Sequence, residues 1–258
     1  MEDDKADYGA RLEALENGDV QMAVYTIDSL LMAGAKAGGF PASIVMVIDE
    51  TKGADAVLAY KSAVASLQDL DDPQARFVLT PSSPSEFLAR VVKSHFNLPN
   101  LSGNWMIEAD GAADVLKKMK AAKQSDKTAY VMWEPQVSQA KKLPGVDVIL
   151  DSSRIKGLIV DVLVARREYL RDHPDKVRAV VEAYSRAAHH YRSQPDGFIK
   201  LVKSDDPNLS DTEAKSLVAG IQWKNTLENY AHFGLVRGVA AGGQPNLCLL
   251  YTSDAADE

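Results

Sequence analysis

The sequence has little that would support metal, disulfide or catalytic chemistry. Cys248 is the only cysteine among 258 residues, which excludes an internal disulfide and any zinc site built from several thiolates. The five histidines show no His-x-x-Glu-His or similar spacing, so neither a metal site nor a cofactor is expected. A Gly-x-Ser-x-Gly elbow, a Gly-x-x-x-x-Gly-Lys loop and a Gly-x-Gly-x-x-Gly fingerprint are also missing. These absences favour a protein that is not an enzyme.

Long apolar runs and an excess of basic residues are missing as well. No run of about 18 uninterrupted apolar residues occurs, so no segment is expected to span a bilayer. The formal net charge of -7 argues against a nucleic-acid partner, because phosphate binding needs clustered Lys and Arg. Residues 1–8 are acidic and polar, the reverse of a secretory signal. Either the protein is cytosolic or the start of the natural chain is not in this sequence.

The sequence does contain a regular alternation of strand-like and helical segments. This alternation is typical of an α/β protein with mainly parallel sheets flanked by helices. Strands are expected at residues 19–25, 44–48, 56–60, 76–79, 105–108, 129–132, 146–150 and 158–165. Beyond residue 165 the pattern predicts an almost wholly helical chain.

Three predicted strand-to-helix junctions carry polar side chains that could bind a ligand. In an open α/β sheet, ligands bind outside the carboxyl ends of the strands, where the N–H groups of the next helix favour anions and polar groups. The junctions supply Thr26, Asp28 and Ser29, then Thr80, Ser82 and Ser83, and finally Trp133 and Glu134. Trp133 offers a face for an apolar or cationic group, and Glu134 offers an acceptor for an amine. Helix capping or core packing would explain the same residue types about as well.

Several short motifs follow one another in a characteristic order. They are LENGDVQMA at 15–23, VIDETKGAD at 47–55, SLQDL at 66–70, WEP at 133–135, and DVLVA at 161–165 leading to YLRDHP at 169–174. In this order they resemble the solute-binding proteins of nitrate, sulfonate and taurine ABC transporters, the NMT1/THI5-like branch of the type II periplasmic-binding fold. The resemblance covers most of residues 10–235.

The resemblance implies two α/β lobes with the ligand held between them. Lobe I would comprise residues 1–50 and a mostly helical return, 157–247, and lobe II would comprise residues 51–156. Lobe I would be incomplete at its N-terminus, because family members begin with a signal sequence and a further strand-helix-strand unit. The cleft would be lined by the eight junction residues together with Asp49, which lies at the first crossing between the lobes.

The implied function is that of the substrate-binding component of an ABC importer. Such a protein captures a small polar or anionic solute between its lobes and delivers it to a membrane permease. The expected partners are therefore a small-molecule ligand and an ABC permease, and the protein is expected to be a periplasmic monomer. Within this reading Asp28, Asp49 and Glu134 could instead favour an amine or a thiamine-like cation.

Two other functions remain open for the same fold. The thiamine-pyrimidine synthases are enzymes that depend on a Cys-rich segment, which this sequence lacks. A ligand-sensing domain of a receptor or regulator would use the same two-lobed clamp. Residues 220–230 look closest to relatives that carry an OmpA-like module, and residues 248–258 resemble a non-native tail.

Overall fold

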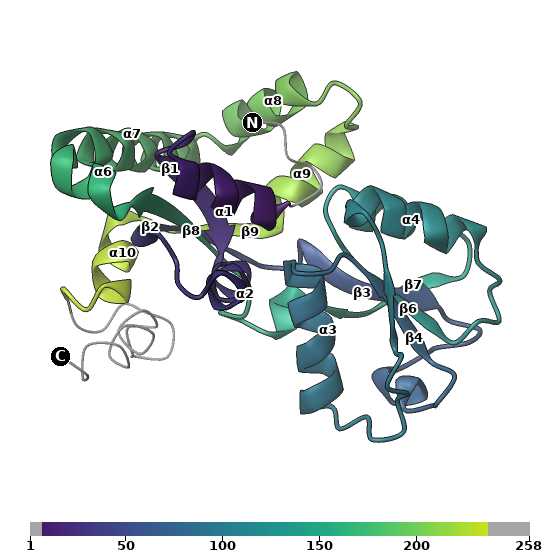
Figure 1. The fold of residues 1–258 in the computed structure, drawn as a ribbon. Helices are drawn as coiled ribbons and strands as arrows, with labels where there is room; N and C mark the ends of the chain where they lie inside the picture. The colour runs from purple at the N-terminus through teal and green to yellow at the C-terminus, as the bar shows by residue number, and fades with distance from the viewer. Residues whose placement is uncertain (1–6, 237–258) are drawn as a thin grey trace.

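The computed structural model describes residues 7–236 as two lobes, each built on its own sheet (Figure 1). The sheet of lobe I has the strand order β1-β8-β2-β9, and that of lobe II has the order β5-β4-β6-β3-β7. Helices flank both sheets, which confirms the expected two-lobed α/β fold. The predicted non-native tail, the last part of the return segment and Cys248 lie outside the described residues.

Lobe I contains two separate segments of the chain. Its elements are α1 (Tyr8–Asn17), β1 (Met22–Thr26), α2 (Ile27–Ala37), β2 (Ala42–Thr51), β8 (Val160–Arg166), α6 (Arg167–Asp172), α7 (Pro174–Ser193), α8 (Pro195–Asp205), α9 (Asp211–Ala219), β9 (Ile221–Trp223) and α10 (Thr226–His232). Gly18 and Gly38 end α1 and α2 in the left-handed conformation, which glycine adopts without steric cost. Ser210 begins α9 with a capping box, in which its side chain and that of Glu213 each accept a backbone N–H of the other residue.

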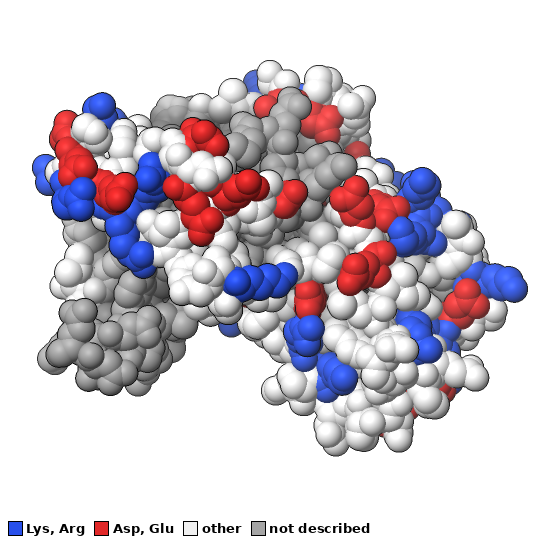
Figure 2. All heavy atoms as spheres, in the orientation of Figure 1, with Lys and Arg blue, Asp and Glu red and all other residues white. Residues whose placement is uncertain are grey.

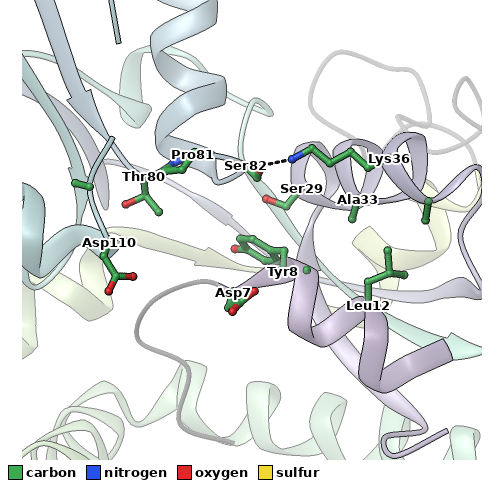
Figure 3. A pocket seen from close by; sticks show the side chains of 13 residues that line it. Asp7, Tyr8, Leu12, Ser29, Ala33, Lys36, Thr80, Pro81, Ser82 and Asp110 are labelled. Carbon is green, nitrogen blue, oxygen red and sulfur yellow. Dashed lines mark hydrogen bonds between the residues drawn. The ribbon is translucent and has the colours of Figure 1, made fainter. Parts of the chain in front are cut away.

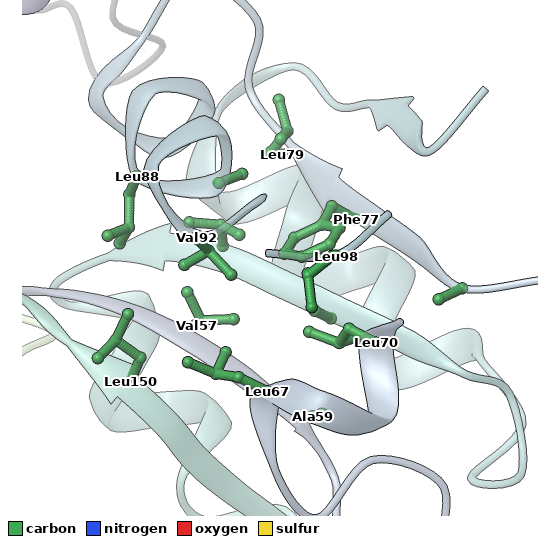
Figure 4. Close-up of a cluster of buried hydrophobic side chains, with 14 of the residues drawn as sticks. Val57, Ala59, Leu67, Leu70, Phe77, Leu79, Leu88, Val92, Leu98 and Leu150 are labelled. Atoms are coloured by element: carbon green, nitrogen blue, oxygen red, sulfur yellow. The ribbon is translucent and has the colours of Figure 1, made fainter. Parts of the chain in front are cut away.

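Lobe II is formed by one continuous segment. Its elements are β3 (Asp55–Tyr60), the 3-10 turn η1 (Leu67–Leu70), β4 (Arg76–Leu79), α3 (Pro84–His95), β5 (Met106–Glu108), α4 (Gly111–Ala121), β6 (Thr128–Trp133), α5 (Gln136–Ala140), β7 (Val146–Asp151) and the 3-10 turn η2 (Ser152–Arg154). Alternate residues of β3 enter two separate cores, Val57 on one face and Leu58 on the other, because successive strand side chains point to opposite faces. Phe77, Leu88 and Leu150 help to fill the first core (Figure 4).

The expectation of mainly parallel sheets is wrong for the described strands. Strand β4 pairs in parallel with β5 and β6, whereas the other five pairings are antiparallel. The physical reason is the crossing between lobes. Strand β3 enters lobe II from lobe I, and β8 enters lobe I from lobe II, so each runs against the strands beside it. The local sequence of a strand carries no sign of this direction.

The two crossings between the lobes lie side by side. The Gly53 N–H donates to Ser152 Oγ at 2.7 Å, and the Thr51 N–H donates to the Ile159 carbonyl at 3.0 Å. Beside them Lys224 Nζ and Glu50 Oε2 form a buried ion pair at 2.7 Å. Two short connections held together in this way make a hinge between the lobes. Within residues 7–236, no helix is both long enough and apolar enough to cross a membrane.

Candidate functional site

The carboxyl ends of strands from both sheets face a cleft between the lobes. In lobe I these are the ends of β1 and β2, and in lobe II the ends of β4, β5 and β6. The cleft contains a larger cavity of about 550 Å³ and a smaller one of about 280 Å³. Tyr8 of α1 lines both cavities, so its ring lies where they meet.

The larger cavity is lined by polar side chains from the two lobes (Figure 3). Ser29 and Lys36 of α2 lie on one side, and Thr80 and Ser82 lie on the other. Lys36 Nζ donates to Ser82 Oγ at 2.6 Å, which is a direct contact between the lobes. Thr80 is only 5% exposed, and its Oγ1 has no hydrogen-bond partner in the described part of the chain. The cavity therefore offers an ammonium donor and an unused hydroxyl.

The loop after β4 shows which of its serines cap the next helix. Ser83 is fully buried, donates its hydroxyl to the Thr80 carbonyl and accepts the Ser85 N–H, so it serves as the N-cap of α3. Ser82 has a positive φ of 56°, and its N–H donates to Glu86. Because its backbone is bound to α3 in this way, the Ser82 hydroxyl is left to meet Lys36 across the cleft.

The smaller cavity lies beside the hinge and is markedly acidic. Its lining includes three carboxylates, two aromatic rings, two threonines and one guanidinium, from Asp55, Glu134, Asp161, Tyr8, Trp133, Thr26, Thr51 and Arg11. The Arg11 guanidinium lies 4.7 Å from the centre of the Tyr8 ring and donates to the Val24 carbonyl at 2.7 Å. The cavity thus combines negative charge with flat aromatic surface.

The strand register brings the acidic residues together. Strand β8 lies between β1 and β2, so Asp161 at its start is opposite both Thr26 and Asp49. Asp55 begins β3 directly after the hinge and is 4% exposed. Asp28, in the first turn of α2, is also 4% exposed. Four carboxyl groups from four elements therefore share one end of the cleft.

Burial dominates the titration of these acids, because it penalises the charged form. It raises the pKa of Asp28 to about 6 and the pKa of Asp55 to about 7. The pKa of Asp161 is raised by burial to about 6, and that of Asp49 is raised well above its usual value by burial and by the neighbouring Asp161. The group therefore holds protons that isolated aspartates would release.

Trp133 and Glu134 follow β6 at the same end of the cleft. Trp133 packs partly against the second core of lobe II and leaves part of its ring to the smaller cavity. Glu134 accepts the Ser138 N–H at 3.0 Å and hydroxyl hydrogens from Ser138 and from Ser216 of α9. Ser216 belongs to lobe I, so Glu134 also connects the lobes.

The structure brings six of the nine predicted site residues to the cavity walls. Thr26, Trp133 and Glu134 line the smaller cavity, and Ser29, Thr80 and Ser82 line the larger one. The other three, Asp28, Asp49 and Ser83, are buried and line neither cavity. The sequence reasoning missed Tyr8, Arg11, Lys36, Thr51, Asp55 and Asp161. Asp55 and Asp161 carried a usable signal, since Asp55 directly precedes the predicted strand at 56–60 and Asp161 is an acid within the apolar strand predicted at 158–165, each near a crossing.

The described fold is that of a two-lobed periplasmic-binding protein of type II, with a cleft lined by strand ends. The family model for NMT1/THI5-like proteins matches residues 3–197. The chain therefore belongs to the NMT1/THI5-like family. No curated protein sequence matches it.

Solved structures of the same fold include three informative neighbours. The periplasmic aliphatic sulphonate binding protein SsuA from Escherichia coli is 19% identical with a TM-score of 0.65, and the match covers 84% of this chain and 68% of that one. The CA3427 gene product of Candida albicans is 14% identical with a TM-score of 0.67, covering 84% and 69%. The alkanesulfonate-binding protein SsuA from Xanthomonas axonopodis pv. citri, bound to MOPS, is 19% identical with a TM-score of 0.62, covering 84% and 72%.

Proposed function

We propose that this protein is the solute-binding component of an ABC importer, which holds a small polar molecule between its lobes and delivers it to a membrane permease. The observation that carries the proposal is the cleft, whose two cavities have walls from both lobes. A ligand touching both walls favours the closed form of the hinge, since it binds that form better. Family membership and the structural similarity to sulfonate-binding proteins support the same role.

Binding without chemical conversion agrees with the residues at the cleft. Neither cavity is lined by any of the described histidines, and Cys248 lies outside the described residues. The two short crossings provide the movement that a solute-binding protein needs. We extend the proposal to a periplasmic location and a monomeric state, with lobe I formed by residues 1–50 and 157–247.

Trp133 provides a direct test, because it is the one tryptophan of the three that lines a cleft cavity. Adding a ligand should change the tryptophan fluorescence and raise the midpoint of thermal unfolding. Trp133→Phe should remove most of the fluorescence change. Trp105→Phe is the matched control, since Trp105 precedes β5 at the far end of the lobe II core and should leave the change intact.

The ligands added in these fluorescence and thermal-unfolding measurements should include small cations, small anions and small neutral solutes. A solute that stabilises the protein should also reduce its radius of gyration in X-ray scattering, because closure brings the lobes together. If no solute of any charge changes either the unfolding midpoint or the scattering, the solute-binding role is wrong.

A further inference from the structure

The smaller cavity is the wrong place for an anion. Asp55 and Asp161 line it together with Glu134, so an oxyanion there would meet three carboxylates. Lys224, a cation that influences the nearby Asp49, is already paired with Glu50 at 2.7 Å. Within residues 7–236, Asp28, Asp49, Asp55 and Asp161 form no salt bridge. The Arg11 guanidinium lines the same cavity and partly offsets the rise that burial causes in the pKa of Asp161, but the cavity still has three acidic residues for this one cation.

Unsatisfied oxygen atoms point to the same conclusion independently of charge. Asp28 and Asp49 are 4% and 5% exposed, and in each of them Oδ1 has no hydrogen-bond partner in the described part of the chain. Thr51, which lines the smaller cavity, also has an Oγ1 without a partner. Buried polar atoms are normally hydrogen-bonded, and leaving them unpaired is costly. Of these three residues only Thr51 lines the cavity, and Asp28 and Asp49 lie behind it. The Thr51 hydroxyl is therefore the unsatisfied group that a ligand in the cavity could reach.

The aromatic walls indicate what kind of cation fits. Tyr8 and Trp133 line the same cavity as the carboxylates, and a positively charged nitrogen is attracted to aromatic rings, as the Arg11 guanidinium 4.7 Å from the centre of the Tyr8 ring illustrates. A metal ion fits less well, because the described residues contain no group of three acids, histidines or cysteines arranged to hold one. A volume of about 280 Å³ suits a small organic group.

We propose that the solute carries a positively charged nitrogen, which lies in the smaller cavity against Asp55 and Asp161 and beside the rings of Tyr8 and Trp133. This inference rests on the proposed solute-binding function and names its substrate class as small organic cations. The rest of the solute extends past Tyr8 into the larger cavity, where Thr80 offers a hydroxyl without a partner.

The test is isothermal titration calorimetry on the full chain with matched probes. Ethanolamine and putrescine carry nitrogens with N–H donors, whereas choline carries a quaternary nitrogen without them. The neutral compound 3,3-dimethylbutan-1-ol copies the shape of choline without its charge. Ethanesulfonate and nitrate represent the anions. We expect at least one cation to bind, with the neutral analogue and the anions at least about tenfold weaker.

Removing a single cavity carboxylate should weaken this binding. Asp161→Asn keeps the shape and should lower the affinity for the cation by about tenfold or more, and Asp55→Asn is a second variant of the same kind. Asp147→Asn is the matched control, because Asp147 is exposed on β7 and pairs with Lys61 away from the cleft. Circular dichroism establishes that each variant is folded. An unchanged affinity in both folded cavity variants would contradict the proposal.

The pH dependence of ligand affinity is a second test, because the affinities for cations and for anions should change in opposite directions as the pH rises. The groups facing the cavity are Asp55, Asp161, Glu134, Tyr8 and Arg11, with Asp28, Asp49 and Lys224 behind them. Because the aspartates release their protons between about pH 5 and about pH 8, cation affinity should rise over that range and protons should be released on binding.

The outcomes separate the two proposals. If the anions or the neutral compound bind and the cations do not, the solute-binding role stands and the charge assignment is wrong. If binding weakens as the pH rises through this range, the charge assignment is also wrong. If no probe binds at all, both proposals fail.

Discussion

The two lobes differ in how they bury their sheets. Lobe II has an extensive core on each face, whereas the outer core of lobe I contains only three buried residues in the described part of the chain, Met46, Ile48 and Leu163. Helix α7, which packs against that outer face, buries only Val177 among its 20 residues. The buried aspartates show the opposite distribution, since Asp28 and Asp49 belong to lobe I and Asp55 to lobe II. On the surface, Figure 2 shows acidic side chains on both lobes.

This difference suggests a division of work between the lobes. Lobe II supplies most of the hydrophobic stability, because buried apolar area is the main favourable term in folding. Lobe I buries Asp28 and Asp49 behind the smaller cavity and places Asp161 at its wall, and this burial lowers stability because it penalises the charged forms. Four predictions test this contrast.

The largest expected effect comes from matched core substitutions. Leu88→Ala removes a fully buried side chain from the first core of lobe II and should lower the free energy of unfolding by about 4 kcal/mol. Leu163→Ala in the outer core of lobe I should cost only about 2 kcal/mol, since that side chain is 9% exposed and has fewer buried neighbours. Chemical denaturation followed by circular dichroism measures both. Equal losses would remove the proposed difference between the lobes.

The buried ion pair at the hinge should give the next largest effect. Lys224→Met leaves Glu50 buried without its cation and should lower the free energy of unfolding by about 3 kcal/mol. Adding Glu50→Gln to that variant should restore part of the loss. Lys203→Met is the control, because the Lys203 pair with Asp211 is exposed and worth under about 1 kcal/mol. Similar losses in Lys203→Met and Lys224→Met would show that burial of the pair is unimportant.

Asp55→Asn should change the free energy of unfolding in the opposite direction, because it should stabilise the protein at high pH. The pKa of Asp55 is raised from 3.8 to about 7, so its contribution to stability is fully present below about pH 4 and is lost as the pH rises through about 7. Asparagine has no charge to bury. At about pH 8 the variant should be more stable than the parent protein, and at about pH 4 the two should be alike. Thermal unfolding across this range, with Asp147→Asn as the control, measures the difference.

Much of the fold could be predicted because the strands are strongly apolar and their ends are marked. The expected strand at 76–79 matches β4. The sequence also marks the end of α2, because Gly38 follows its last residue. Strand direction could not be predicted, because β3 and β8 owe their antiparallel pairing to the crossings between lobes. A single sequence does not show which segments cross.

The residues of the candidate site could be predicted only at strand-to-helix junctions. Thr80 and Trp133 were found in this way. Tyr8 and Arg11 were not, because they come from α1, where no strand-to-helix junction was predicted, and only the folded chain brings them to the cleft. Ser83 shows the converse, since its residue type suited binding but its hydroxyl caps α3.

The smallest expected effect concerns the contact that joins the lobes across the larger cavity. Lys36 is exposed, so Lys36→Met should change the free energy of unfolding by less than about 0.5 kcal/mol despite losing its hydrogen bond to Ser82. The same loss acts on the balance between open and closed forms and should favour the open form by about twofold. The shift is small because Ser216 and Glu134, together with Lys142 and Glu213, still connect the lobes elsewhere.

X-ray scattering of the ligand-free protein can detect this shift as a larger radius of gyration in Lys36→Met. Lys61→Met is the control, because Lys61 pairs with Asp147 within lobe II and should leave the scattering unchanged. An unchanged radius in Lys36→Met would mean that the contact with Ser82 does not influence closure. A large loss of stability in Lys36→Met would mean that the contact stabilises the fold itself. The distinction between residues that stabilise the fold and residues that control closure of the cleft would then be wrong for Lys36.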